Sequence, residues 1–405
     1  MASLDTIAPS AGIAPTPAGV RYATDRTPTG SQRWLALDVA RGVAVAGMLV
    51  VEQMPGGPRP HPWLVHATWN GWTGADLVFP AFLFFVGIAV DQLVHRRGPR
   101  SLLRLARRAL ALVVLGVLFN AWAGDGSNFG DARWPGVLQR IGVVGLLCGL
   151  VVVLCRRGVW SILLIAAAIL VLYATLLTHV PLACGTGLVT PTCNVPGRID
   201  VALFGAAHVY QHGALGHDPE GVLSTMGAVA TALVGVAVGR VMRTRPGWPT
   251  MAALCGAALV AWMLTHTGLA GPTVNKRMWT PAFVLLTGAT STLLLVACHG
   301  VSDVGARMVN PLVQRASQVI SWPWAALGRN ALVVYVGQHV LGAVVAHTPA
   351  HVGSQLTNTA GLLQAHSFAL GWLGLDSQWA YVTGMLLVWL AVAAAMHRAR
   401  WYVTL

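Results

Sequence analysis

Residues 159–177, VWSILLIAAAILVLYATLL, form an apolar run without a single charged side chain. A helix of about 20 such residues spans the hydrocarbon core of a bilayer. In lipid the backbone must satisfy its own hydrogen bonds, which only a helix or a closed barrel allows, and the length here is that of a helix. The run therefore predicts a membrane-spanning helix, and it sets the frame for interpreting the rest of the chain.

Runs of this kind recur along the 405 residues, of which 55% are apolar and only 10% charged. Soluble domains usually carry about 25% charged residues. We therefore expect an all-α polytopic protein of the cell membrane, surrounded by membrane lipids, with about ten transmembrane helices. The expected spans are 35–53, 75–94, 102–123, 136–155, 159–177, 222–242, 250–268, 280–299, 325–346 and 379–397. The apolar segment 360–375 contains Gln364 and His366, so we expect it to be interfacial or re-entrant.

Residues 1–32 precede the first span and differ from it in composition. They are rich in Ala, Pro, Thr and Gly and contain no apolar core, so they do not form a signal peptide. Such a composition is typical of a disordered segment. We predict a disordered cytoplasmic tail at 1–32, followed by one membrane domain at 33–405.

The net charge of +13 does not indicate a nucleic-acid partner, because the arginines stand in short blocks between apolar runs. That is the signature of membrane topology, in which basic loops stay in the cytoplasm. Eighteen basic residues fall on one side of the expected spans and six on the other. The first side is therefore predicted to be cytoplasmic, together with both termini. The long loops 54–74, 178–221 and 347–378 are predicted to face outward.

The first span begins with charged residues on one face. Asp38 and Arg41 are three residues apart and share a helix face, and Arg33 stands just before them. Charged side chains inside a span are costly and usually meet a partner or a cavity. One interpretation is a local ion pair that anchors the helix at the cytoplasmic interface. The other is an anion site, for instance for phosphates that enter from the cytoplasm.

The densest polar stretch is HATWNGWTGADLVFP at 66–80. It places His66, Asn70 and Asp76 within eleven residues, just before a long apolar span. Histidine is the side chain best suited to proton transfer near neutral pH, and Asp76 would orient it or stabilise its charge. The alternative is an ordinary interfacial cluster, because aromatic side chains are common at membrane interfaces.

The sequence GVLQRIG at 136–142 places Gln139 and Arg140 at the outer end of a span. The preference for basic residues on the cytoplasmic side does not explain an arginine there. Arg140 is therefore expected to meet either an anionic ligand or a structural partner, with Asp76 and Asp131 as the candidates.

Two other outward segments carry candidate binding residues. Lys276, the single lysine of the chain, stands in VNKRMWT at 274–280 between Asn275 and Arg277, close to Trp279. This set suggests ligand binding, or else anchoring at the interface. Glu220 precedes a span at its outer face, where it would either contact a ligand or stabilise the start of the helix.

The cysteines and histidines show no metal-binding pattern, because their spacing does not match known ligand sets, and we expect no metal. Cys184 and Cys193 lie in an outward loop, where either a disulfide or two free thiols are compatible with the sequence. The other four cysteines lie in apolar spans and are expected to be small core residues.

Eight separated motifs, taken together and in order, resemble the heparan-α-glucosaminide N-acetyltransferase family of transmembrane acyltransferases. The motifs are LDVARG at 37–42, HATWNGWTGADLVFP at 66–80, PGVLQRIG at 135–142, GRID at 197–200, HVYQH at 208–212, HDPEG at 217–221, VNKRMW at 274–279 and LGRNALVVYVG at 327–337. Each piece is short, but their order along residues 33 to 345 is specific.

The resemblance implies an enzyme that takes acetyl groups from cytoplasmic acetyl-coenzyme A. It would pass them to an amino sugar or another glycan acceptor on the far side of the membrane. The catalytic histidine of the family falls on His66, which would act as nucleophile or as general base. Glu52 occupies the place of an Asn that the animal member has near the outer end of the first span. Glu52 is therefore expected to polarise or orient His66.

The expected site combines these residues, and we also expect a homodimer. Catalysis is assigned to His66, Glu52 and Asp76. Substrate or cofactor binding is assigned to Arg33, Asp38, Arg41, Asn70, Gln139, Arg140, Glu220, Asn275, Lys276 and Trp279.

Two other functions fit the membrane topology. A transporter or flippase of a sugar or lipid-linked substrate would use the same charges inside spans. Transporters often consist of two similar halves, and we see no such repeat here. A structural scaffold would explain the spans but not the outward His, Asn, Asp and Lys residues.

Overall fold

The computed structural model describes residues 34–53, 61–123, 130–155, 158–187, 189–214, 216–269, 271–352, 355–358 and 377–403. The chain divides into two compact units, Met1–Trp34 and Leu35–Leu405, and all elements described here belong to the second. The predictions for residues 1–32, for Arg33 and for the segment 360–375 fall outside the described residues.

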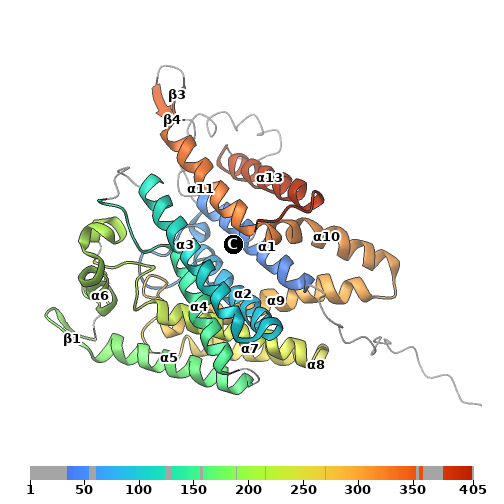
Figure 1. Ribbon diagram of the computed structural model, residues 1–405, viewed down its shortest axis with the longest axis horizontal. Helices are drawn as coiled ribbons and strands as arrows, with labels where there is room; N and C mark the ends of the chain where they lie inside the picture. The colour runs from blue at the N-terminus through green and yellow to red at the C-terminus, as the bar shows by residue number, and fades with distance from the viewer. Residues whose placement is uncertain are drawn as a thin grey trace, which may run out of the picture. The chain divides into compact units, whose positions relative to one another are not determined.

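Helices make up most of the second unit (Figure 1). They are α1 Leu35–Gln53, α2 Gly74–Arg97, α3 Ser101–Ala123, α4 Val137–Leu154, α5 Val159–His179, α6 Val195–Phe204, α7 Thr225–Thr244, α8 Trp248–Leu264, α9 Pro281–His299, α10 Pro311–Arg329, α11 Ala331–His347 and α13 Ser377–Arg398. Short helical turns are η1 Pro62–Leu64, η2 Gly98–Arg100, η3 Ala206–His208, η4 Tyr210–Gly213, η5 Gly300–Val304 and η6 Gly305–Arg307. The strands pair as two antiparallel hairpins, β1 Pro181–Leu182 with β2 Gly185–Thr186 and β3 Pro349–Val352 with β4 Gln355–Asn358.

Within the described residues, six segments are long and apolar enough to cross a membrane. They are Gly74–Trp122, Val137–Leu154, Val159–His179, Thr225–Thr244, Pro281–Arg307 and Gln378–Arg398. The first segment contains both α2 and α3, and α8 and α11 are apolar but shorter. The protein is therefore a mostly helical, multi-pass membrane protein.

Each expected span overlaps a helix, but the span at 325–346 differs from the structure. Two helices meet there, since α10 ends and α11 begins at Asn330. The side-chain amide of Asn330 donates to the carbonyl of Ala326, one turn back, and its backbone leaves the helical conformation. α10 has a strongly one-sided apolar pattern with Pro323 inside it, so the sequence did not predict it as a span.

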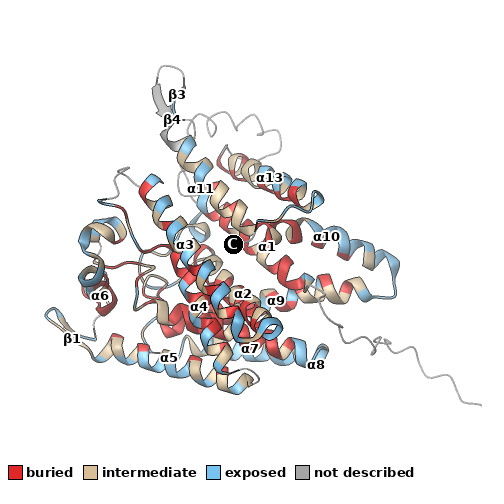
Figure 2. Cartoon of the chain, in the orientation of Figure 1, coloured by how far each residue is buried: buried red, intermediate tan, exposed pale blue. Residues whose placement is uncertain are grey.

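Buried residues cover α7, α9 and α1 most densely, and α7 packs against α2 in the interior of the unit (Figure 2). In the most apolar stretch of α7, 78% of the residues are buried, whereas only 17% are buried in that of α5. α5 is therefore a peripheral helix. Glycines allow α2 and α7 to approach closely. A Cβ on Gly87 would lie 1.9 Å from the carbonyl oxygen of Ala232, and a Cβ on Gly235 would lie 2.1 Å from that of Phe84. Small residues permit such contacts between helices in membranes.

A buried ion cluster also joins α2 and α7 close to the C-terminal end of each helix. Asp91 is fully buried and accepts a 2.8 Å hydrogen bond from Nε of Arg240 as well as one from Arg243. Nη1 of Arg240 also donates to the carbonyls of Cys155 and Gly158, at 2.9 and 3.0 Å. The cluster thus ties the α4–α5 connection to α7, and both belong to the end predicted to be cytoplasmic.

We expect Gly87→Ala to destabilise the protein, because the added methyl group forces α2 and α7 apart. Overpacking of this kind costs about 1–3 kcal/mol. The thermal unfolding midpoint of the purified protein in detergent measures the effect. Gly256→Ala in α8 is the matched control, since nothing lies within 4 Å of its added Cβ. Equal midpoints for the two variants would contradict the close-contact interpretation.

Candidate active site

The loop that carries His66 ends where α2 begins, and Asp76 in the first turn of α2 organises it. Asp76 is fully buried, and its Oδ2 accepts hydrogen bonds from the backbone N–H groups of Ala67 at 3.1 Å and Thr73 at 2.9 Å. A carboxylate is also stabilised at a helix N-terminus by the helix dipole. The buried acid therefore holds both ends of the 67–73 loop.

The other oxygen of Asp76 contacts the imidazole of His66. Nδ1 of His66 lies 2.9 Å from Oδ1 of Asp76, and the His66 side chain is 47% exposed. Because a carboxylate can only accept, Nδ1 carries the proton in this contact. In the neutral ring Nε2 then carries the lone pair. This arrangement, a base oriented by a buried acid, is that of a general base or a nucleophile.

Lys276 completes this group from a distant loop. Its Nζ lies 2.9 Å from Nδ1 and 3.1 Å from Nε2 of His66, and 3.4 Å from Oδ1 of Asp76. Burial lowers the pKa of Lys276 below its ordinary value, and the negative charges of Asp76 and Glu220 oppose this shift. The structure thus brings together three residues that the sequence separates by up to 210 positions.

The loop with Lys276 is attached to the His66 loop by buried polar contacts. The side-chain amide of Asn275 donates to Oδ1 of Asn70 at 3.2 Å, and its Oδ1 accepts from the backbone N–H of Met278 at 2.9 Å. The backbone N–H of Gly71 donates to the carbonyl of Val274 at 2.8 Å. Asn275 is fully buried. These contacts favour a supporting role for Asn70 and Asn275, whose assignment to ligand binding stays a prediction.

Trp279 and Arg140 lie in the core behind this loop. Trp279 is 1% exposed, has a backbone φ of 50°, and donates from Nε1 to Oγ1 of Thr231. The guanidinium of Arg140 lies 5.0 Å from the Trp279 ring, and its Nη2 donates to Gly221 O and to Ser224 Oγ. Arg140 therefore contacts the segment before α7, rather than the Asp76 or Asp131 expected from the sequence.

Glu220 lies in an ion cluster with an arginine that the sequence analysis did not single out. Nη2 of Arg133 lies 2.5 Å from Oε2 of Glu220 and from Oδ1 of Asp218. Burial alone would raise the pKa of Glu220, but Arg133 and Arg140 lower it below its ordinary value. Glu220 is five residues before the start of α7, too far to act in the first helical turn. The signal for Arg133 was its position on the outward side, where basic residues are scarce.

Gln139 supports the turn that precedes α4. Its Nε2 donates to the carbonyl of Trp134 at 2.9 Å, and its side chain fills the space beside Gly116 and Gly136. The contacts of Gln139 in the structure are thus with the protein itself, and its assignment to ligand binding stays a prediction.

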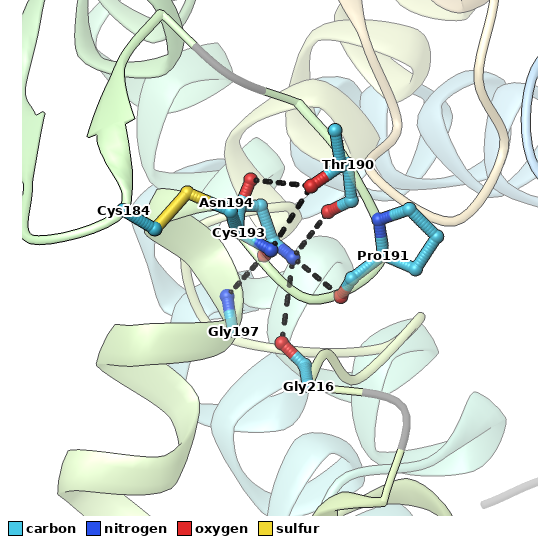
Figure 3. Close-up of a disulfide and its surroundings, with 7 residues drawn as sticks. All are labelled: Cys184, Thr190, Pro191, Cys193, Asn194, Gly197 and Gly216. Carbon is cyan, nitrogen blue, oxygen red and sulfur yellow. Dashed lines mark hydrogen bonds between the residues drawn. A yellow bond between two sulfur atoms is a disulfide. The ribbon is translucent and has the colours of Figure 1, made fainter.

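A disulfide joins Cys184 and Cys193 in the loop after α5 (Figure 3). Next to it, Asn194 accepts from the N–H of Gly197 at 2.7 Å and donates to the carbonyls of Thr190, Pro191 and Gly216. Nε1 of Trp69 donates to the carbonyl of Val189 at 2.9 Å. The disulfide loop is thereby fastened to the His66 loop.

The remaining predicted site residues lie on α1 and have other partners. Glu52 contacts Nε2 of His339 on α11 at 3.3 Å, and the structure does not pair it with His66. Asp38 lies 4.0 Å from Nε of Arg329 at the other end of α1. Arg41 faces the same end and is partly buried.

No group of three or more His, Cys, Asp or Glu side chains with the arrangement of a metal site occurs among the residues that the structure describes.

Comparison with known proteins shows what the chain is similar to. Residues 33–195, which include His66 and Asp76, match a family model described as heparan-alpha-glucosaminide N-acetyltransferase, catalytic. The human heparan-alpha-glucosaminide N-acetyltransferase is 28% identical over 380 residues, covering 79% of this chain and 55% of that protein. The mouse protein of the same name is 26% identical over 384 residues, covering 80% and 56%. The chain thus spans about half the length of these relatives.

The family model covers the motifs LDVARG, HATWNGWTGADLVFP and PGVLQRIG, and the matches bear out the resemblance to this family. The chain is thus similar to the heparan-alpha-glucosaminide N-acetyltransferases, with residues 33–195 matching the model of their catalytic region.

Proposed function

We propose that the protein is a transmembrane acetyltransferase. It transfers the acetyl group of cytoplasmic acetyl-coenzyme A to an amino sugar or other glycan on the extracytoplasmic side. The observation that carries the proposal is the group of His66, Asp76 and Lys276, in which a partly exposed imidazole is oriented by a buried acid. The names of the human and mouse relatives support the reaction class.

Each residue of the group has a role in acyl transfer. Asp76 holds the Nδ1 proton of His66, so that Nε2 can take the proton of the attacking amine or attack the thioester itself. In both routes the carbonyl oxygen gains negative charge while the thiolate leaves. Lys276 lies close enough to His66 for its ammonium group to stabilise that charge.

The site is proposed to lie on the outer side of ten transmembrane helices, with both termini in the cytoplasm. The contacts between loops support this topology. The loops carrying Gly71 and Val274, both predicted to face outward, bond to each other. The Asp91 cluster joins α7 to the connection between α4 and α5, both at the end predicted to be cytoplasmic.

The phosphates of the donor are proposed to bind at Arg41, together with Arg33 and the arginine-rich segment 96–108. Arg108 of α3 is close enough to Arg41 of α1 for their positive charges to repel each other. Such a pair favours an anion beside it, and guanidinium groups match phosphate geometry well. An extended coenzyme A would then lie along the protein with its thioester near His66.

A transporter or flippase is the alternative, because charged residues in spans also mark transport paths. The two functions differ in one product. Only the acetyltransferase releases free coenzyme A from acetyl-coenzyme A.

We expect His66→Ala to abolish acetyl transfer, because it removes the imidazole that Asp76 orients to act as base or nucleophile. Purified protein is incubated with labelled acetyl-coenzyme A and a panel of amino sugars, and coenzyme A release and acetylated product are measured. His266→Ala, which changes an exposed histidine after α8, should retain full activity. Near-normal turnover in His66→Ala would refute the assigned mechanism.

We expect Lys276→Ala to lower kcat/KM at least tenfold, about 1.4 kcal/mol, because the charge beside His66 is lost. Lys276→Arg should recover part of the activity, since it restores the charge with a different shape. Arg198→Ala provides the control, because it removes an exposed outward cation from α6. A rate for Lys276→Ala that matches the control would reduce Lys276 to an interface anchor.

We expect Arg41→Ala to weaken coenzyme A binding by about tenfold, the loss of one charge-assisted contact of roughly 1.5 kcal/mol. Binding of coenzyme A and dephospho-coenzyme A is measured for protein reconstituted in one orientation. Arg245→Ala in the exposed α7–α8 connection is the control. Unchanged binding to Arg41→Ala, with binding only from the outside, would contradict the donor path.

A further inference from the structure

The amino group of Lys276 contacts the same imidazole that is assigned to acetyl transfer. Its Nζ lies 3.1 Å from Nε2 of His66, the ring nitrogen that takes part in the proposed reaction. An acetyl group within reach of Nε2 is therefore also within reach of Nζ, because the two atoms are one hydrogen bond apart. Groups that are held this close react as if their concentration were very high. Lys276 thus lies where the amine of an acceptor must approach.

A hydrogen-bonded turn fixes the backbone from which Lys276 extends. The backbone N–H of Trp279 donates to the carbonyl of Lys276 at 3.0 Å, and that of Thr280 donates to the carbonyl of Asn275 at 3.2 Å. Trp279 ends this turn with a φ of 50° and is 1% exposed, so the turn is anchored in the core. The side chain of Lys276 is only 16% exposed and extends from this anchored turn to His66.

The groups around Lys276 act on its charge in opposite directions. Burial lowers the pKa of Lys276, and the nearby Arg277 acts in the same direction. The negative charges of Asp76 and Glu220 oppose this shift.

The contact with His66 also shows where a proton of Lys276 can go. Because Nδ1 of His66 carries the hydrogen that faces Asp76, Nε2 accepts the hydrogen of Nζ. The base that would take a proton from an acceptor amine can therefore take one from Lys276. A lysine that has lost its proton is a nucleophile for carbonyl carbon.

We propose that Lys276 is a self-acetylation site, which takes the acetyl group when no acceptor is bound and thereby inactivates the enzyme. The inference rests on the acetyl-transfer function proposed above. The ammonium group gives one proton to Nε2 of His66, which passes it to solvent. The amine then forms an N–C bond with the carbonyl carbon of the thioester, the C–S bond breaks, and a second N–H proton goes through Nε2 to the thiolate. The products are acetyl-lysine and free coenzyme A.

Acetylation changes the site in a defined way, because it removes the positive charge of the side chain. The acetylated Lys276 can no longer stabilise negative charge on a carbonyl oxygen beside His66. We therefore expect the modified enzyme to resemble Lys276→Ala, with kcat/KM lowered at least tenfold. A bound acceptor protects Lys276, since its own amine takes the acetyl group first.

The test is specific because Lys276 is the single lysine of the chain. Purified wild-type protein is incubated with labelled acetyl-coenzyme A without acceptor, and acetyl-lysine is located by peptide mass spectrometry. We expect label at Lys276 that resists hydroxylamine, which removes an acetyl group from histidine. Activity measured afterwards with an amino sugar should fall at least tenfold in step with the label. An amino sugar present during the incubation should prevent both the label and the loss.

Two variants separate catalysed acetylation from chemical acetylation. His66→Gln retains Lys276 but lacks the base, so it should acquire no acetyl-lysine. Lys276→Arg cannot be acetylated, and its remaining activity should not decline during the same incubation. Equal labelling of His66→Gln and wild type, or an unlabelled Lys276 in protein that acetylates the amino sugar, would overturn the inference while acetyl transfer still stands. If wild type acetylates no acceptor and releases no coenzyme A, the proposed function fails and the inference fails with it.

Discussion

The rest of the site depends on the hydrogen bonds that the carboxylate of Asp76 accepts. It is fully buried at the N-terminus of α2, and it bonds to the backbone of Ala67 and Thr73 as well as to His66. A buried carboxylate without partners would be strongly unfavourable, so its surroundings must supply donors. The loop folds around that requirement, and the orientation of His66 follows. Lys276, from another loop, then contacts both His66 and Asp76.

The position of α2 gives this contact its rigidity. α2 packs against α7 at close glycine contacts and is joined to it again through Asp91 and Arg240. A helix fixed at both places cannot shift its N-terminus without breaking buried interactions, which is costly. The candidate site thus includes one residue, Asp76, on a rigid element, although His66 and Lys276 belong to loops.

Several polar residues near the site have hydrogen-bonding partners within the protein. Asn275 and Trp279 are almost wholly buried, and each has a hydrogen-bonding partner within the protein. Buried polar groups need such partners because water cannot replace them. Glu52 differs, since it does not pair with His66 and contacts His339 of α11 in a partly exposed position.

The sequence by itself determined the helical membrane class, the helices that overlap the ten expected spans and the resemblance to the acetyltransferase family, and it predicted a role for His66. These follow from apolar run length and from local motifs, which depend on neighbouring residues only. The break at Asn330 and the partners of Arg140 and Glu52 were decided by the tertiary structure. Each depends on which side chain a distant helix presents, and a periodic pattern in one segment contains no information about that. The meeting of Lys276 with His66 across 210 residues is of the same kind, because packing alone brings the two loops together.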